Sequence, residues 1–223
     1  MIHTQTIQFL EELKANNNKP WFDANRKAYE TAKQNFGEVV GELIKGIGKF
    51  DKAIEESNLQ VKNCIFRINR DVRFSKDKSP YKTNFGAWFN AGGKKANGAG
   101  YYFHIDANEC FYAGGVWMPE NEDLKKIREE IDYNYEEIKG IIDNPDFRKH
   151  FANGLDREAS LTRPPKGYDE SNPAVELLKL KSFTVSNTFD IKEVLKKDFA
   201  DKALEGFEAI HSFNEFLNRA IKG

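Results

Sequence analysis

The segment Tyr101-Tyr-Phe-His-Ile-Asp-Ala-Asn-Glu-Cys-Phe-Tyr-Ala-Gly-Gly-Val-Trp117 decides the fold class of this chain. It contains two runs of aromatic and apolar residues, 101–106 and 110–117, that are typical of β-strands. The four residues 106–109 form a hairpin turn between these runs. Strands joined this tightly are antiparallel, because a parallel crossover needs about a dozen residues or more.

Further strands and flanking helices complete the predicted fold. We expect two more strands at 62–74 and 85–91, and an edge strand near 183–187. Before them, apolar residues at helical spacing predict one helix from Pro20 to about Ile47, and another helix closes the chain. Helices and strands therefore occupy separate blocks, which predicts the α+β class. Its central antiparallel sheet would have about four to six strands, formed by residues 62–117 plus a possible edge strand near 183–187, and would pack with N- and C-terminal helices.

The composition is that of an ordinary globular protein. The chain has 223 residues, of which 31% are charged and 39% hydrophobic, and its net charge is −1. No linker rich in Pro, Gly and Ser divides it, so we expect a single globular domain over residues 1–223. The near-neutral charge is atypical of a dedicated nucleic-acid-binding protein. No apolar run reaches the roughly 20 residues needed to span a membrane, so no membrane partner is expected.

The cysteines and the first residues indicate the cellular compartment. Cys64 and Cys110 lack the spacing of a zinc site, and we expect both to be reduced. The first 18 residues are amphipathic but lack the basic start and long apolar stretch of a signal peptide. A cytoplasmic location is therefore expected.

Residues 65–82, Ile-Phe-Arg-Ile-Asn-Arg-Asp-Val-Arg-Phe-Ser-Lys-Asp-Lys-Ser-Pro-Tyr-Lys, form the most basic segment. In an extended chain, alternate side chains point to opposite faces. The face expected toward the core carries Phe66, Ile68, Arg70, Val72 and Phe74, whereas the opposite face carries Ile65, Arg67, Asn69, Asp71 and Arg73. Guanidinium groups suit bidentate contact with carboxylates or phosphates, and Asp71 could orient both Arg67 and Arg73. A buried Arg70 would need a carboxylate or backbone carbonyls around it.

The charge around this segment is local. Residues 62–95 contain nine basic and two acidic residues, a local charge of +7 in a chain of net charge −1. The candidate ligand-binding residues are Arg67, Asn69, Asp71, Arg73, Lys78, Tyr81, Lys82 and Arg163. An ion-pair network that only stabilises the sheet is the alternative explanation for the arginines and Asp71.

His104 is the other candidate for chemistry. It shares one strand face with Tyr102 and Asp106, so it could act as an oriented general base or simply form hydrogen bonds at the sheet surface. The candidate catalytic residues are thus His104 and Asp71. No third ligand at metal-site spacing, no GxSxG motif and no GxxxxGK[ST] loop is present, so neither a metal nor another cofactor is expected.

Several segments together resemble one uncharacterised family, the "domain of unknown function 2461" family. They are Asn17–Phe22 with Arg26 and Tyr29, Arg70–Lys82, Tyr102–Ile105, and Gly114–Trp117. The resemblance covers nearly the whole chain and implies a single-domain soluble protein, found mostly in bacteria and in some fungi. It implies no activity.

Three hypotheses follow for the function. The first is a basic pocket beside the sheet that binds a phosphate- or carboxylate-bearing small molecule, with or without catalysis. The second is an interaction module for nucleic acid or protein, in which bases would stack on aromatic residues between basic strands. The aromatic residues considered for stacking are Phe74, Tyr81, Trp88, Tyr101 and Tyr102. The third is a structural role for the arginine and aspartate ladder.

Overall fold

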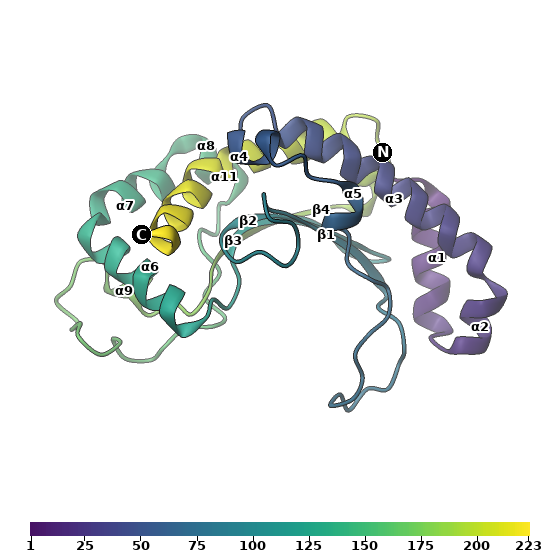
Figure 1. The fold of residues 1–223 in the computed structure, drawn as a ribbon, viewed down its shortest axis with the longest axis horizontal. Coiled ribbons are helices and arrows are strands. Elements are labelled where there is room, and N and C mark those ends of the chain that lie inside the picture. Colours follow the sequence, from purple (N-terminus) through teal and green to yellow (C-terminus); the bar gives the residue numbers. More distant parts are fainter. The chain divides into compact units, whose positions relative to one another are not determined.

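Four strands form one open antiparallel sheet in the order β1-β2-β3-β4, in a computed structural model that describes residues 1–223 (Figure 1). The strands are β1 (Asn84–Phe89), β2 (Gly100–Asp106), β3 (Cys110–Val116) and β4 (Phe183–Phe189). The hairpin turn at 106–109 is confirmed, because the Asp106 N–H donates to the Glu109 carbonyl over 2.8 Å. The Asp106 carboxylate also accepts from the N–H groups of Asn108 and Glu109. The predicted α+β class is therefore confirmed.

Eleven helices accompany the sheet. They are α1 (Thr4–Ala15), α2 (Lys19–Ala24), α3 (Arg26–Ile47), α4 (Lys52–Glu56), α5 (Val61–Cys64), α6 (Asn121–Tyr133), α7 (Tyr135–Asp143), α8 (Pro145–His150), α9 (Val175–Leu178), α10 (Ile191–Val194) and α11 (Phe199–Lys222). None of them combines the length and hydrophobicity that crossing a bilayer would require. The predicted single helix from Pro20 to Ile47 is divided at Asn25, where α2 ends and α3 begins.

The predicted strand at 62–74 is wrong. Its first residues belong to α5, and residues 65–82 form an irregular two-legged hairpin, called here the arm. The legs pair through an isolated bridge between Asn69 and Tyr81 and through the bond from the Lys82 N–H to the Ile68 carbonyl. The Asp71 and Asp77 carboxylates accept the backbone N–H groups of Arg73 and Ser79 near the tip, and such bonds compete with a regular strand ladder. The expected alternation of faces fails at Phe74, which is exposed.

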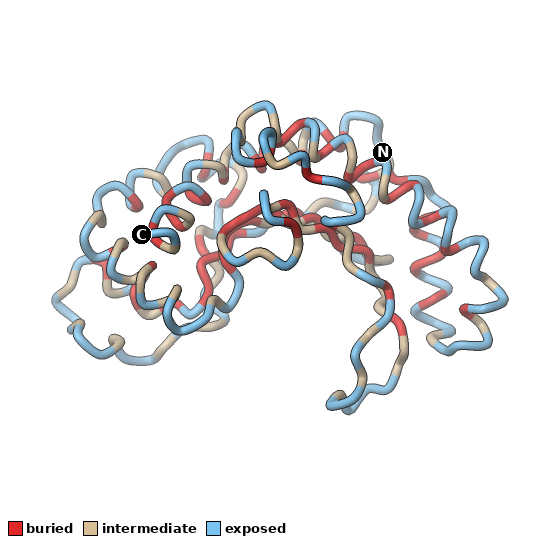
Figure 2. The backbone as a smooth tube through the Cα atoms, viewed as in Figure 1, coloured by how far each residue is buried: buried red, intermediate tan, exposed pale blue.

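The chain forms two compact units, and β2, β3, β4 and α11 each contribute residues to both. The first unit comprises residues 1–95, 102–112 and 188–205. In its core, Phe36 of α3 stacks on Phe85 of β1 and Phe103 of β2, with ring centroids 5.3 and 5.7 Å apart. Helices thereby cover one face of β1 and β2. Figure 2 shows these strands mostly buried and the arm mostly exposed or intermediate.

The second unit comprises residues 96–101, 113–187 and 206–223. Its core includes an edge contact between Tyr101 and Phe207 at 5.3 Å and a similar contact between Phe147 and Phe213 at 6.0 Å. Gly115 of β3 has φ of +112° and lies against the backbone of β4. A Cβ atom at this position would be 1.9 Å from the Phe183 carbonyl oxygen, so only glycine fits.

We expect Gly115→Ala to lower the free energy of unfolding by about 2–4 kcal/mol, because it adds both backbone strain and a clash with β4. Gly140→Ala is the matched control, since a Cβ at Gly140 in α7 meets nothing within 4 Å. That variant should gain about 0.5–1 kcal/mol from helix propensity. Urea unfolding followed by circular dichroism measures both, and equal stabilities of the two variants would contradict the close packing of β3 on β4.

Candidate functional site

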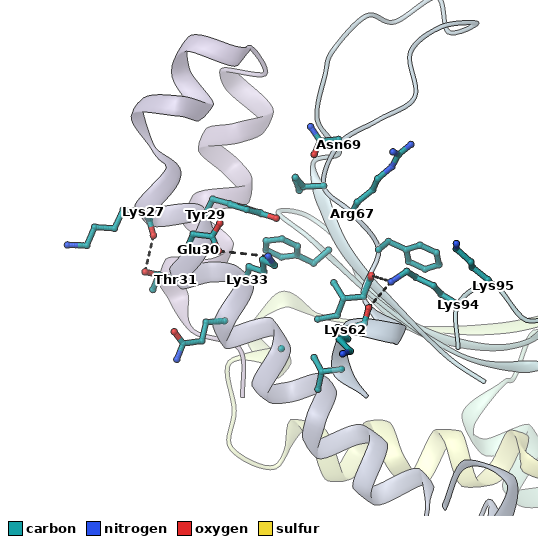
Figure 3. A pocket seen from close by; sticks show the side chains of 17 residues that line it. Lys27, Tyr29, Glu30, Thr31, Lys33, Lys62, Arg67, Asn69, Lys94 and Lys95 are labelled. Carbon is teal, nitrogen blue, oxygen red and sulfur yellow. Dashed lines mark hydrogen bonds and ion pairs between the residues drawn. The ribbon is translucent and has the colours of Figure 1, made fainter. Parts of the chain in front are cut away.

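An open cavity of about 1150 Å³ lies within the first unit, between α3 and the segment 61–69 (Figure 3). We call it the basic pocket. Six cationic side chains line it and only one acidic side chain, that of Glu30. The six cations are Lys27, Lys33, Lys62, Arg67, Lys94 and Lys95. Such an excess of positive charge favours an anionic ligand.

Two of these cations already have partners. The Lys94 ammonium donates to the carbonyls of Lys62 and Ile65, over 2.8 and 2.9 Å, at the C-terminal end of α5. It therefore fixes the wall of the basic pocket. Lys33 lies 3.9 Å from Glu30 on the next turn of α3.

Arg67, Lys62, Lys95 and Lys27 form no ion pair with the protein's own acids. Figure 3 shows Lys27 extending away from the opposite wall, whereas Lys62, Arg67 and Lys95 belong to that wall and point in different directions. Arg67 is exposed, and its guanidinium forms no hydrogen bond. Its five N–H donors are therefore available to a ligand.

Lys82 places a further positive charge near Arg67. Its ammonium lies 5.2 Å from the centroid of the Phe66 ring and forms no ion pair. Burial lowers the pKa of Lys82, and the positive charge of Arg67 lowers it further. Two neighbouring cations without a carboxylate salt bridge repel each other, and a bound anion would relieve this repulsion.

The apolar wall of the basic pocket includes Tyr29, Phe66 and Phe85. Only 9% of the Tyr29 surface is exposed, and its hydroxyl has no hydrogen-bond partner. In Figure 3 this hydroxyl points from α3 toward the segment that carries Arg67 and Asn69. Burial raises the pKa of Tyr29, so the hydroxyl remains a neutral donor at physiological pH.

The other predicted arginine and its aspartate form a closed pair on the arm. Arg73 donates from Nε and Nη2 to the two Asp71 carboxylate oxygens, over 3.0 and 2.6 Å. This contact is the main reason why the pKa of Asp71 is lowered, and Arg67 adds only a smaller electrostatic effect. Asp71 thus orients Arg73 and not both arginines, and Arg73 does not line the basic pocket.

Arg70 has the partners that its half-buried position requires. It donates to the Asp77 carboxylate, to the Ser79 carbonyl over 3.1 Å and to the Ser75 hydroxyl over 3.3 Å. Hydrogen bonds from Ser79, together with the bond from Arg70, lower the pKa of Asp77 to about 2. The expectation of a carboxylate or backbone carbonyls around Arg70 is confirmed by the Asp77 carboxylate and the Ser79 carbonyl.

The remaining predicted ligand residues lie outside the basic pocket. The Lys78 ammonium donates to the Val72 carbonyl over 3.0 Å, within the arm. Tyr81 is 6% exposed and stacks on Phe22 at 4.0 Å. Arg163 is exposed in the second unit.

Of the eight predicted ligand residues, the pocket wall therefore contains only Arg67 and Asn69. The sequence analysis did not identify Lys27, Tyr29 and Lys33 as lining residues. All three lie in the first turns of the amphipathic helix α3, where such side chains are ordinary and do not by themselves indicate a ligand.

His104 lies on β2 with its ring stacked on Phe111 at 4.6 Å. Its Nδ1 is 3.0 Å from the Tyr102 hydroxyl and 3.5 Å from the Asn84 amide nitrogen. Because an amide nitrogen only donates, Nδ1 is the acceptor and Nε2 carries the proton. Nε2 faces the Asp106 carboxylate at 4.0 Å.

His104 and Tyr102 are both neutral at pH 7. Burial lowers the pKa of His104, although the charge of Asp106 opposes the effect. Burial also raises the pKa of Tyr102 to about 12. Asp71, the other candidate catalytic residue, is held on the arm by Arg73. No group of three or more potential metal ligands occurs in the structure.

The fold and the pocket define an α+β protein with a basic, partly aromatic cavity between α3 and the segment 61–69. The chain belongs to the family described as "Conserved hypothetical protein (DUF2461)", whose model matches residues 5–216, as the resemblance predicted. Comparison with curated proteins and with solved structures finds no match.

We expect acid to destabilise the wild-type protein through His104. Because the folded-state pKa is below the unfolded value of about 6.5, the stabilising contribution is complete above pH 6.5. It is lost as the pH falls through the folded-state pKa. Between pH 7.5 and pH 5, the wild type should therefore lose more unfolding free energy than His104→Gln. Urea titrations at each pH measure the difference, and an NMR titration midpoint of His104 at or above 6.5 would contradict it.

Proposed function

We propose that this protein binds a phosphate-bearing small molecule in the basic pocket. The observation that carries the proposal is Arg67, an unpaired guanidinium at a pocket with six cationic side chains and one acidic side chain. A structural ion-pair network would be expected to use such a group, as Asp71 uses Arg73. An arginine left without an acid is available to a ligand oxyanion.

The chemistry of the walls suggests a role for each side chain. Arg67 would bind two oxyanion oxygens at once, since its planar fork matches phosphate and carboxylate geometry. Lys62 and Lys95 would add electrostatic attraction without fixed geometry. The Tyr29 hydroxyl would donate one directional hydrogen bond, and Phe66 and Phe85 would contact the less polar part of the ligand.

Several unpaired cations favour phosphate over a single carboxylate. A phosphate monoester carries close to two negative charges at neutral pH, and a pyrophosphate carries more. The Coulomb attraction to each lysine increases with the charge of the ligand. We propose binding alone, because the Tyr102–His104 cluster, the candidate for catalysis, is separate from the cationic wall. The ring of Phe66, which lines the pocket, lies 6.3 Å from that of Tyr102.

We also propose a cytoplasmic location in a bacterial cell. Two free and buried cysteines, Cys64 and Cys110, support this location. Burial raises the pKa of both thiols, which favours unreactive, reduced side chains. The family resemblance supports the bacterial source.

Inorganic pyrophosphate is a suitable probe of the basic pocket. At a concentration of 100 times its dissociation constant, it should stabilise the wild type by about 2.7 kcal/mol. Arg67→Gln should weaken binding at least about tenfold, because it removes a charge-assisted bidentate contact. The exposed side chain of Arg67 lets the variant fold normally. Isothermal titration calorimetry measures the dissociation constants, and thermal unfolding measures the stabilisation.

Arg163→Gln is the matched control, since it removes the same charge from an exposed arginine in the second unit. It should bind pyrophosphate as the wild type does. Equal losses in the two variants would show that only net charge matters and would contradict a site at Arg67. Citrate, tested in the same way, distinguishes a carboxylate ligand from a phosphate ligand.

A further inference from the structure

The arm is a two-legged hairpin that projects below β1 in Figure 1. Its legs are paired by the Asn69–Tyr81 bridge and by the bond from the Arg70 N–H to the Pro80 carbonyl. Its base is attached to the turn between α1 and α2, where the Asn17 side chain bonds the backbone of Tyr81 in both directions. The arm is therefore anchored at one end and exposed at the other.

The side chains of the arm stiffen its own tip. Arg70 joins Asp77 to the Ser79 carbonyl, and the Lys78 ammonium bonds the Val72 carbonyl across the loop. The Asp77 carboxylate also accepts the Ser79 N–H over 2.9 Å. These contacts reduce the conformational freedom that the tip would lose on binding a partner.

The same contacts leave the arm with a positive charge of +4. Residues 65–82 contain six basic and two acidic side chains, and arginines of the arm hold both acids. The uncompensated cations lie at both ends of the arm. Arg67 and Lys82 are near the base, and Lys76 and Lys78 are near the tip.

Phe74 occupies the tip and is 96% exposed, the most exposed large apolar side chain of the protein. The guanidinium of Arg73 lies 5.8 Å from its ring centroid, and Asp71 holds that guanidinium. No ring of another element packs on Phe74. The tip thus presents an apolar ring in water, on a stiffened and cationic support.

We propose that the arm binds in a groove of B-form duplex DNA, with Phe74 as a wedge between base pairs. The major groove, about 12 Å wide, admits a two-stranded ribbon, and phosphates line both of its sides. Minor-groove proteins that kink DNA insert an apolar side chain at a base step and use nearby cations for the backbone, and we propose the same use of Phe74 from the major-groove side. The arm combines both features. The narrow major groove of duplex RNA would not admit it.

The distribution of charge favours DNA over an anionic membrane. A flat lipid surface would contact only the tip and would leave Arg67 and Lys82 near the base unused. A groove bordered by phosphates can contact cations along both legs. This inference goes beyond the proposed function, because Phe74, Lys76 and Lys78 do not line the basic pocket.

The test uses the full chain and a duplex of about 25 base pairs, labelled at both ends. Fluorescence anisotropy should show that the logarithm of the binding constant falls linearly with the logarithm of the salt concentration. The slope should be about −3 to −4, because about four cations displace counterions. Energy transfer between the end labels should rise as the duplex kinks. Lys76→Gln should reduce the slope by about one.

Phe74→Ser should abolish the kink and weaken binding at least about tenfold, without altering stability, since the side chain is exposed. Tyr133→Ser is the matched control, because Tyr133 is an 89% exposed aromatic side chain in α6 of the second unit. It should bind and kink DNA as the wild type does. Both variants should bind pyrophosphate unchanged, which separates the tip of the arm from the basic pocket.

Three results would overturn the inference. The first is the absence of duplex binding at 50 mM salt. The second is equal binding and kinking by Phe74→Ser and Tyr133→Ser. The third is a preference for duplex RNA or for vesicles containing phosphatidylserine, with the same loss in Phe74→Ser, which would assign the tip to another partner.

Discussion

The attachment of the arm at Tyr81 is the contact on which the candidate sites depend. The Asn17 amide nitrogen donates to the Tyr81 carbonyl over 2.9 Å, and the Asn17 carbonyl oxygen accepts the Tyr81 N–H over 3.1 Å. Phe22 stacks on the Tyr81 ring. The turn before α2 thus supplies to Tyr81 the backbone hydrogen bonds that a neighbouring strand would otherwise supply. It holds the second leg of the arm, and cross-leg bonds then hold the first leg, which carries Arg67.

The arginines of the arm are paired with carboxylates toward its tip, whereas the cations at its base are unpaired. Toward the tip, Arg70 and Arg73 are matched with Asp77 and Asp71, so these arginines stabilise the loop. At the base, Arg67 and Lys82 lie near each other and form no ion pair. Exposed ion pairs contribute little to stability, so the tip contacts matter mainly for shape. The unpaired cations at the base are the groups that we propose contact an anion.

The sequence predicted the regular part of the fold because that part follows local patterns. The two strands around the 106–109 turn and the helix start at Pro20 were found in this way. The segment 62–74 also alternates, but alternation shows only that a chain is extended. It does not reveal whether a partner strand continues alongside. At Phe74 no partner does, and the side chain predicted for the core lies in water.

The candidate site was less predictable, because its walls come from distant parts of the chain. Arg67 and Asn69 were identified from their own segment. Lys94 was part of the local charge, yet its role as a bond donor to the end of α5 depends on how the loop folds back. The pairing of Asp71 with Arg73, and not with Arg67, depends on side-chain directions that spacing alone does not define.

The bonds that shape the tip of the arm join residues at most nine positions apart. The tip is therefore a nearly autonomous module whose geometry is encoded within its own short sequence. Substitutions at Phe74 or Lys76 would change the exposed surface of the tip while the hydrophobic core remains as it is. Evolution could alter that surface at little risk to folding, and an engineer could transplant the loop to another hairpin.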